Sequence, residues 1–205
     1  MKDTKRIVVK VGTSTITHGH GKPNFHNIEL LCRVLSDMGY EVVLVSSGAI
    51  GVGVGKLRLS EKPKELKLKQ AIASVGQCEL MHLYDKFFGE YGQIIGQILM
   101  TYDNVDNSYS RQNLENTFSA LLELGVIPVV NENDSVCTTE VETGENKVLG
   151  DNDTLSAIVA QLCKADLLIL LSDIDGLYDS DPHKNPSARL IDTVEQLDER
   201  IYALA

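Results

Sequence analysis

The stretch Lys10-Val11-Gly12-Thr13-Ser14 determines how the rest of this chain is interpreted. It follows Arg6-Ile7-Val8-Val9, an apolar and β-branched run that predicts a buried strand. A lysine at the end of such a strand suits an oligophosphate, because Gly12 lets a ligand approach the backbone and free N–H groups in the turn can form an anion-binding nest. Lysines that only terminate a strand are common, so phosphate binding and plain strand termination both stay open at this point.

The composition is that of an ordinary globular protein. The chain has 205 residues, with 43% hydrophobic and 23% charged, enough to bury a sizeable core as one large domain or two small ones. No apolar run reaches the ~18 residues of a membrane-spanning helix, and the N-terminus has no apolar signal-peptide core. The net charge of −10 argues against a general nucleic-acid binder. We therefore expect a cytoplasmic protein with neither a nucleic-acid nor a membrane partner.

Neither the cysteines nor the histidines are spaced like metal ligands. The four cysteines are scattered, with no Cys-x-x-Cys pair, which argues against a zinc site and a disulfide framework: Cys32, Cys78, Cys137 and Cys163. Reduced, mostly buried thiols are expected. His18 and His20 alternate with glycines and lack nearby carboxylates, which favours a flexible connector over a metal site. No metal ligand can be assigned from these patterns.

Apolar runs and amphipathic segments alternate along the chain. Strands are expected at residues 6–10, 41–45, 94–99, 126–130 and 167–171. Helices are expected after an Asn27 cap, over residues 66–88 and around Phe118–Leu124. A further helix is expected to open within Gly150–Thr154 and to include Leu162. Residues 102–108 are expected as a loop, residues 138–141 as a short hairpin arm, and residues 187–205 as a tail with one weakly amphipathic helix. This alternation predicts an α/β fold in which a mostly parallel sheet is sandwiched between helices in three layers.

The glycine-rich stretch Gly51-Val52-Gly53-Val54-Gly55-Lys56 resembles a nucleotide-binding loop but has the wrong spacing. Lys56 stands where the dinucleotide motif needs its third glycine, and a Walker A loop would need Ser or Thr at Leu57. This excludes a Rossmann dehydrogenase. We interpret the stretch as a close-packed helix start, and we expect Gly76 to weaken the long helix that follows.

Small or polar clusters end four of the five predicted strands: residues 10–14, 46–48, 131–134 and 172–173. Each cluster alone could be ordinary turn chemistry, because Asn, Asp, Ser and Gly dominate turns. In a parallel sheet, however, all of these clusters share one edge, and ligands of such sheets bind there. The joint pattern therefore predicts a ligand site at the carboxyl edge of the sheet.

Part of this edge suits an α-amino acid. The backbone N–H groups of Ser47 and Gly48 could bind a carboxylate at a helix N-terminus. Asp134 and the amide oxygen of Asn152 could accept hydrogen bonds from an ammonium group. These residue types in this order predict an amino-acid pocket.

The remaining groups suit phosphoryl transfer, which needs cations and little covalent help. Lys10 is the candidate cation. Asp153 could hold that lysine in position, or Asp151 and Asp153 could together approach Mg²⁺. An adenine nucleotide would rest against Ser172 and Asp173.

The chain closely resembles the bacterial glutamate 5-kinases of the amino acid kinase superfamily, over nearly its whole length. The matching stretches are Val8–Ser14, Ser47–Ile50, Ala73–Gln77, Val130–Asp134, Gly150–Asp153, and Asp175–Tyr178 before Asp181-Pro182. Asn-Glu-Asn-Asp followed by Gly-Asp-Asn-Asp at this separation is specific within the superfamily, whereas the lysine-glycine turn is shared by its other members.

The resemblance implies ATP-dependent phosphorylation of the side-chain carboxylate of L-glutamate, the first step towards proline, with ATP and Mg²⁺ as cofactors. It implies catalytic roles for Lys10 and Asp153, glutamate binding by Ser47, Gly48, Asp134 and Asn152, and ATP contacts by Gly12, Ser172 and Asp173. It also implies a homo-oligomer, a dimer or tetramer, that proline can inhibit.

One family motif is missing. The family carries Gly-Thr-Gly-Gly-Met-x-Thr-Lys, which closes over the nucleotide, and we expect it soon after residues 190–204, yet the sequence ends at Ala205. Residues 1–205 are therefore expected to be an amino acid kinase domain without its nucleotide-closing segment and without a C-terminal PUA domain. Two alternatives stay open: a kinase of the same superfamily that acts on aspartate, acetylglutamate, carbamate or uridylate, and a non-catalytic amino-acid sensor of the same fold.

Overall fold

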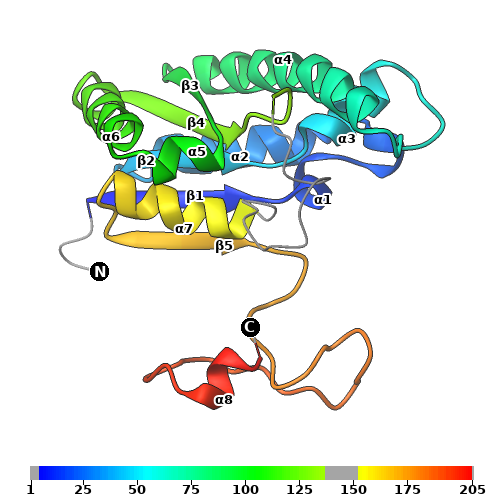
Figure 1. Ribbon diagram of the computed structural model, residues 1–205, viewed down its shortest axis with the longest axis vertical. Coiled ribbons are helices and arrows are strands. Elements are labelled where there is room, and N and C mark those ends of the chain that lie inside the picture. Colours follow the sequence, from blue (N-terminus) through cyan, green and yellow to red (C-terminus); the bar gives the residue numbers. More distant parts are fainter. Residues whose placement is uncertain (1–4, 137–151, 205) are drawn as a thin grey trace. The chain divides into compact units, whose positions relative to one another are not determined.

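The computed structural model describes residues 5–136 and 152–204. The chain divides into two compact units, Met1–Leu171 and Ser172–Ala205, and each is described by itself (Figure 1). The predicted hairpin arm over residues 138–141 and the Cys137 thiol lie outside the described residues.

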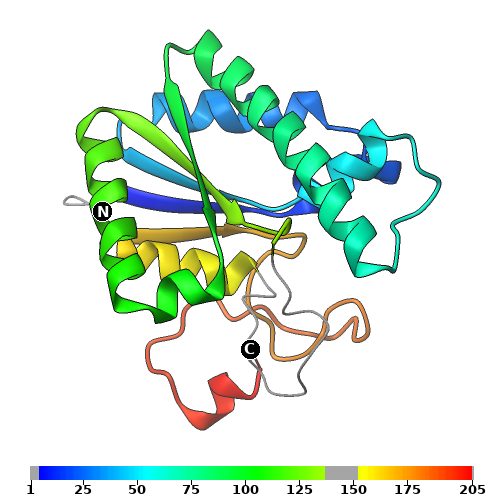
Figure 2. The same cartoon turned by 45° about the horizontal axis from the view of Figure 1, so that its top comes forward.

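A parallel sheet forms the centre of the first unit. In the described part of this unit it has five strands in the order β3-β4-β2-β1-β5, and every neighbouring pair is parallel. The strands are β1 Arg6–Val11, β2 Glu41–Ser46, β3 Ile94–Met100, β4 Val126–Glu132 and β5 Leu167–Leu171. Figure 2 shows the arrowheads of β1, β2, β4 and β5 pointing the same way. The predicted parallel sheet and its strands are confirmed.

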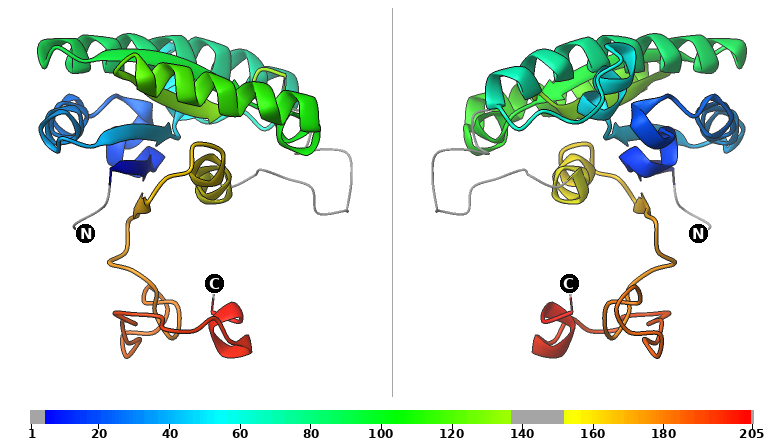
Figure 3. Two further views of the ribbon diagram at one scale, coloured as in Figure 1. Left: turned by 90° about the vertical axis from the view of Figure 1, so that its left-hand side faces the viewer. Right: turned by 90° about the vertical axis from the view of Figure 1, so that its right-hand side faces the viewer.

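Helices cover both faces of this sheet. They are α1 Thr13–Ile16, α2 Phe25–Asp37, α3 Ala49–Lys56, α4 Leu66–Glu90, α5 Tyr102–Asp106, α6 Ser108–Glu123 and α7 Asn152–Leu162. One core contains side chains of α2, α3 and α4, the other those of α6 and α7, and Figure 3 shows α2 and α7 on opposite sides of the sheet. No described helix is both long and apolar enough to cross a membrane.

Strand β1 separates the two cores by simple alternation. Ile7, Val9 and Val11 belong to the core beneath α2 and α4. Val8 belongs to the core beneath α6 and α7. Because side chains along a strand alternate between faces, Lys10 lies on the same face as Val8. This alternation along β1 thus places the lysine on the face of the sheet that α7 covers.

Helices α3 and α4 pack with their backbones unusually close together. A Cβ atom added at Gly53 would lie 2.1 Å from the carbonyl oxygen of Ile72, and one at Gly76 would lie 1.7 Å from that of Ala49. The interpretation of residues 51–56 as a close-packed helix is confirmed. Helix α4 runs without a break through Gly76, and α3 packs against α4 at this glycine.

Two local predictions are also corrected. Helix α2 is capped by Asn24, whose side chain accepts a hydrogen bond from the Asn27 backbone N–H, rather than by Asn27 itself. Residues 102–108 are not a loop throughout, since α5 occupies most of them. The Thr101 and Asn104 side chains form a capping box that stabilises the start of α5.

The second unit is short and built mostly from turns. An isolated antiparallel bridge joins Tyr178 to Leu190. Helix α8, Glu199–Tyr202, begins after Asp198, whose carboxylate accepts a hydrogen bond from the Ile201 N–H. The single helix predicted for the tail is therefore present.

Candidate active site

Lys10 and Asp153 form an ion pair at the carboxyl end of β1. The Nζ atom of Lys10 lies 2.6 Å from Oδ1 of Asp153. The fold causes this pairing, because α7 packs on the face of β1 to which Lys10 belongs. Asp153 lies in the first turn of α7, where the helix dipole also favours a carboxylate. Since only 9% of Lys10 is exposed, the carboxylate holds the ammonium group in one position.

Gly12 lies close to this ammonium group. A Cβ atom at Gly12 would lie 3.9 Å from Lys10 Nζ and 3.8 Å from Ser14 Oγ. A side chain at this position would therefore begin in contact with the lysine head group. Gly12 therefore places its backbone next to the Lys10 ammonium group, and phosphate binding at this turn stays a prediction.

Ser47 and Asn152 meet next to this pair. The Nδ2 group of Asn152, the first residue of α7, donates a hydrogen bond to Ser47 Oγ. The Ser47 backbone N–H donates to the Val11 carbonyl oxygen at 3.0 Å. The expectation that the Ser47 N–H would be offered to a substrate carboxylate is therefore corrected, because the end of β1 already uses it. The Asn152 amide oxygen remains the acceptor that this pair can present.

Gly48 provides the turn between Ser47 and α3. Its φ of +100° is in the left-handed region that favours glycine, and an added Cβ would lie 2.9 Å from Ile16 Cδ1. Within the described residues, no hydrogen bond is found for its backbone N–H. Gly48 thus presents a donor at the start of a helix of eight residues, where an anion is favoured.

A buried tyrosine supports this turn, and no local sequence pattern indicates this role. Ser46 Oγ donates to the Ser47 carbonyl oxygen at 3.0 Å, so the Tyr84 hydroxyl is the donor in its 2.8 Å contact with Ser46 Oγ. Burial raises the pKa of Tyr84 well above its ordinary value and so keeps the hydroxyl protonated. Helix α4 is therefore tied to the backbone that carries Ser47.

A pocket of about 400 Å³ opens beside this turn, between α3, α4, β3 and the end of β4. Ala49, the residue after Gly48, is part of its lining. Asp134, predicted to bind an ammonium group, lines the pocket together with Glu132. Two carboxylates in one pocket give it a negative character that suits a cationic group.

Sequence reasoning missed the role of Glu132 and Gln77 as lining residues. Both lie in stretches that had already been singled out, residues 131–134 and 73–77. The signal was present, but no local pattern states that α4 and the end of β4 face a common space.

Two predicted nucleotide ligands belong to the second unit. Ser172 and Asp173 follow β5 directly, and Ser172 Oγ lies 3.3 Å from Asp173 Oδ1. Their contact with a nucleotide stays a prediction.

The described residues do not form a metal cage. Within residues 5–136 and 152–204, no three His, Cys, Asp or Glu side chains gather closely enough to hold a metal ion. Asp153 contacts Lys10, and Asp151, its suggested partner for Mg²⁺, lies outside the described residues.

Three of the four cysteines lie among the described residues. Cys32, Cys78 and Cys163 are all free. Burial raises the pKa of Cys32 to about 12 and that of Cys163 to about 11. Cys78 is exposed and lines the pocket, so the expectation of burial fails for this one described thiol.

Comparison with known proteins identifies the family of this chain. Residues 5–200 match the model of the amino acid kinase family. The chain is 56% identical over 208 residues to the glutamate 5-kinase of Clostridium perfringens, an alignment that covers 100% of this chain and 77% of that protein. It is 55% identical to the glutamate 5-kinase of Listeria innocua, covering 100% of this chain and 75% of that protein.

Solved structures agree on the fold. An isopentenyl phosphate kinase from T. acidophilum has a TM-score of 0.60 at 19% identity, over 91% of this chain and 78% of that one. A UMP kinase from Ureaplasma parvum has a TM-score of 0.61 at 17% identity, over 98% of this chain and 85% of that one. At such identities the likeness concerns the fold alone. From the family match and the high identity to its named relatives, we conclude that the chain belongs to the amino acid kinase family and, within it, to the glutamate 5-kinases.

Proposed function

We propose that this chain transfers the γ-phosphoryl group of ATP to the side-chain carboxylate of L-glutamate and forms γ-glutamyl phosphate, the first step towards proline. One observation supports this most directly. The Lys10–Asp153 pair and the Ser47–Asn152 pair lie at the same sheet edge, beside a pocket with two carboxylates. The high identity to proteins named glutamate 5-kinase supports glutamate as the acceptor.

In the proposed reaction, a γ-carboxylate oxygen of glutamate attacks the γ-phosphorus of ATP. A new P–O bond forms while the bond to the β,γ-bridging oxygen breaks, and that oxygen leaves with ADP. Negative charge spreads over the phosphoryl oxygens in the transition state, so a fixed cation lowers the barrier. Lys10 supplies this cation, and Asp153 positions it.

Four residues are proposed to bind glutamate. Asp134 faces the ammonium group with its carboxylate, and Gly48 offers its N–H to an anionic group. Ser47 and Asn152 act as a unit, because the hydrogen bond between them fixes both side chains. The substrate would thus lie between the pocket and the end of β1.

On the nucleotide side we propose Gly12, Ser172 and Asp173. Gly12 is supported by its position beside the Lys10 ammonium group. We propose that Mg²⁺ binds together with the ATP phosphates and keeps several water ligands, as it commonly does in kinase sites.

We further propose a homo-oligomer that proline inhibits, as the family resemblance implies, and a location in the cytoplasm. The free state of Cys32, Cys78 and Cys163 supports a reducing compartment.

Ligand binding and turnover together test the acceptor. Thermal unfolding is followed with glutamate, aspartate, uridylate, proline or Mg-ATP, and acyl phosphate is trapped with hydroxylamine. A ligand at ~100 times its Kd adds ~2.7 kcal/mol to the free energy of unfolding. A raised midpoint with glutamate but not with aspartate or uridylate, with hydroxamate formed from glutamate and ATP, is expected. Glutamate binding without product would favour the sensor, and a shift with another acceptor alone would overturn glutamate.

A further inference from the structure

A chain of hydrogen bonds joins the end of β4 to helix α4 through one buried amide. The backbone N–H of Glu132 donates to Asn131 Oδ1 at 2.9 Å. The Nδ2 group of Asn131 in turn donates to Gln77 Oε1 at 2.8 Å. Asn131 is only 3% exposed, so both ends of its amide are satisfied inside the protein.

The order of donors along this chain has one solution. A backbone N–H can only donate, so the atom of Asn131 that faces Glu132 must be its oxygen. The other end of Asn131 is then an NH₂ group, which can only donate, and the Gln77 atom that receives it must be the oxygen. The amide orientation of Gln77 is thereby fixed, and the hydrogens of its Nε2 are what this side chain can offer a ligand.

Gln77 brings an amide donor to this pocket, whose lining also includes the amides of Gln97 and Asn133. Gln77 lines the pocket with the carboxylates of Glu132 and Asp134, which can only accept hydrogen bonds when ionised. The lining hydroxyls are already donating, Ser74 to the Gln70 carbonyl oxygen and Ser135 to Asn133 Oδ1. An α-amino acid brings an ammonium group for the carboxylates and also an α-carboxylate, which requires an N–H partner.

We propose that Gln77 is a specificity-determining residue that donates a hydrogen bond from Nε2 to the α-carboxylate of the acceptor amino acid. This inference rests on the proposed function. Because the buried amide of Asn131 holds Gln77 in one orientation, little rotamer freedom is lost on binding. The same pocket thus binds both α-substituents, the ammonium group on Glu132 and Asp134 and the carboxylate on Gln77.

Gln77→Glu separates the two roles of this side chain. A carboxylate at position 77 still accepts from Asn131, so the link between α4 and β4 survives. It cannot donate, and it places a negative charge opposite the substrate carboxylate. We expect the Kd of L-glutamate, measured by calorimetry, to rise at least about tenfold, in line with the loss of a hydrogen bond to a charged group.

The α-amide of L-glutamate supplies the discriminating measurement. Its neutral amide can donate to the new carboxylate, so we expect its Kd to change little or to fall in Gln77→Glu. The ratio of the two Kd values should therefore shift by at least about tenfold towards the α-amide. Gln112→Glu, the same change on exposed α6, is the control and should leave the ratio unchanged.

A purely structural role gives a different result. Gln77→Met removes both the acceptor and the donor. If Gln77→Glu does not fold, the Kd ratio is measured in Gln77→Met instead. The inference expects a smaller preference for glutamate over its α-amide in this variant too. An unchanged ratio in folded variants, with both ligands weakened equally, overturns the role of Gln77 while leaving the proposed function intact. Failure of the unsubstituted chain to bind glutamate overturns the proposed function, and this inference with it.

Discussion

At the scale of single residues, strand β1 carries an ion pair at each end, and the two pairs have different surroundings. Arg6 Nη2 lies 2.8 Å from Glu41 Oε2 at the amino end, and Lys10 Nζ lies 2.6 Å from Asp153 Oδ1 at the carboxyl end. The Arg6 side chain is 25% exposed and that of Lys10 is 11% exposed. The first pair is a solvent-screened surface contact, which contributes little. The second holds a nearly buried cation where the ligands of parallel sheets bind.

Lys10→Ala should therefore lower kcat far more than it raises the KM for glutamate. Removing one group that meets transition-state charge typically costs about 3 kcal/mol, or about a hundredfold in rate. Steady-state kinetics with glutamate and Mg-ATP measure both constants. Glu41→Ala, which breaks the pair at the other end of the same strand, is the matched control and should leave kcat unchanged. An intact kcat in Lys10→Ala would contradict the role of this lysine.

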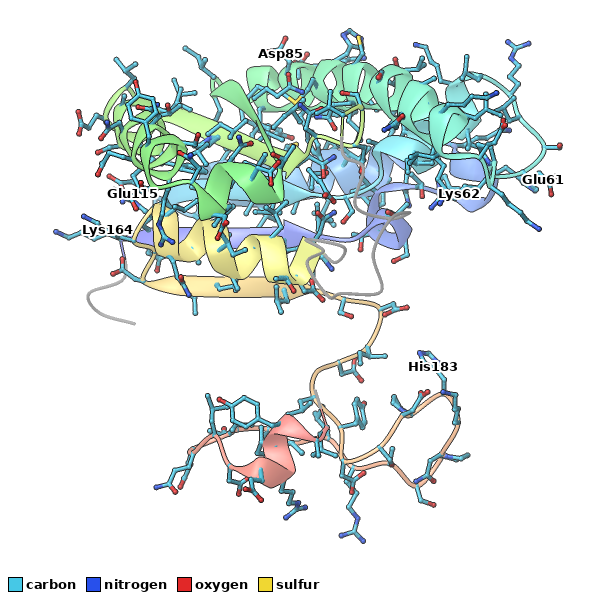
Figure 4. All side chains as sticks on the ribbon, viewed as in Figure 1. Glu61, Lys62, Asp85, Glu115, Lys164 and His183 are labelled. Atoms are coloured by element: carbon cyan, nitrogen blue, oxygen red, sulfur yellow. The ribbon has the colours of Figure 1, made fainter. Side chains whose placement is uncertain are left out.

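Asp134→Asn should act mainly on glutamate binding. The substitution removes the charge that we place opposite the ammonium group but keeps the size of the side chain. We expect the Kd of glutamate to rise about tenfold or more, because hydrogen bonds to charged groups contribute about 1.5–3 kcal/mol. Asp85→Asn is the control, since Asp85 is exposed on the outer side of α4 (Figure 4). Equal Kd values in the two variants would remove Asp134 from the site.

At the scale of secondary-structure elements, glycines set the distance between α3 and α4. Two glycines on one helix, Gly76 and Gly89 of α4, differ completely in their surroundings. A Cβ at Gly76 would overlap the Ala49 carbonyl oxygen at 1.7 Å, whereas a Cβ at Gly89 meets nothing within 4 Å. The Ala49 backbone belongs to α3, whose first residue, Ala49, lines the pocket. Packing of these helices thus bears directly on the site.

Gly76→Ala should destabilise the fold by about 1–3 kcal/mol or more, because backbone cannot yield as a flexible side chain would. Gly89→Ala should instead stabilise it by about 0.5–1 kcal/mol, since alanine favours the helix. Urea unfolding of both variants gives the two changes, which should have opposite signs. A Gly76→Ala variant as stable as the unsubstituted chain would show that α3 and α4 can separate without cost.

At the scale of the whole molecule, hydrogen bonds to Asp166 hold the start of β1 next to the start of β5. Its Oδ2 atom accepts from the backbone N–H groups of Lys5 at 2.8 Å and Arg6 at 2.9 Å. The hydrogen bonds from Arg6 and then Lys5 lower the pKa of Asp166 below its ordinary value of 3.8. A carboxyl whose pKa is lower in the folded state stabilises the fold above the unfolded pKa, and this contribution is lost as the pH falls through the folded pKa.

Asp166→Ala should therefore lower the midpoint of thermal unfolding at pH 7 but have progressively less effect below about pH 4. The comparison is made by calorimetry at several pH values. Asp85→Ala, which alters an exposed carboxylate on α4, should show no such pH-dependent difference. A difference from the unsubstituted chain that persists undiminished at pH 2 would assign the effect to packing rather than to ionisation.

Periodicity determined the parallel sheet, its strands and the edge at which polar clusters gather, because alternation and helical spacing are local properties of a sequence. The order of residues within those clusters also carried the resemblance to the glutamate 5-kinases. Local patterns failed where two nearby asparagines could cap the same helix, as Asn24 and Asn27 could. They also could not show that Gly76 packs against the Ala49 backbone of α3.

Only the tertiary structure decided which groups meet. Asn152 reaches Ser47 across 105 residues, and Asn131 reaches Gln77 across 54. Such contacts depend on the register of parallel strands and on the face to which each helix returns, and neither is encoded in any short window of sequence. The sequence by itself determined what kinds of groups stand at the carboxyl edge. Packing of α7 over β1 and of α4 over β4 determined that Lys10 is paired, that the Ser47 N–H is already used, and that Gln77 has a donor to offer.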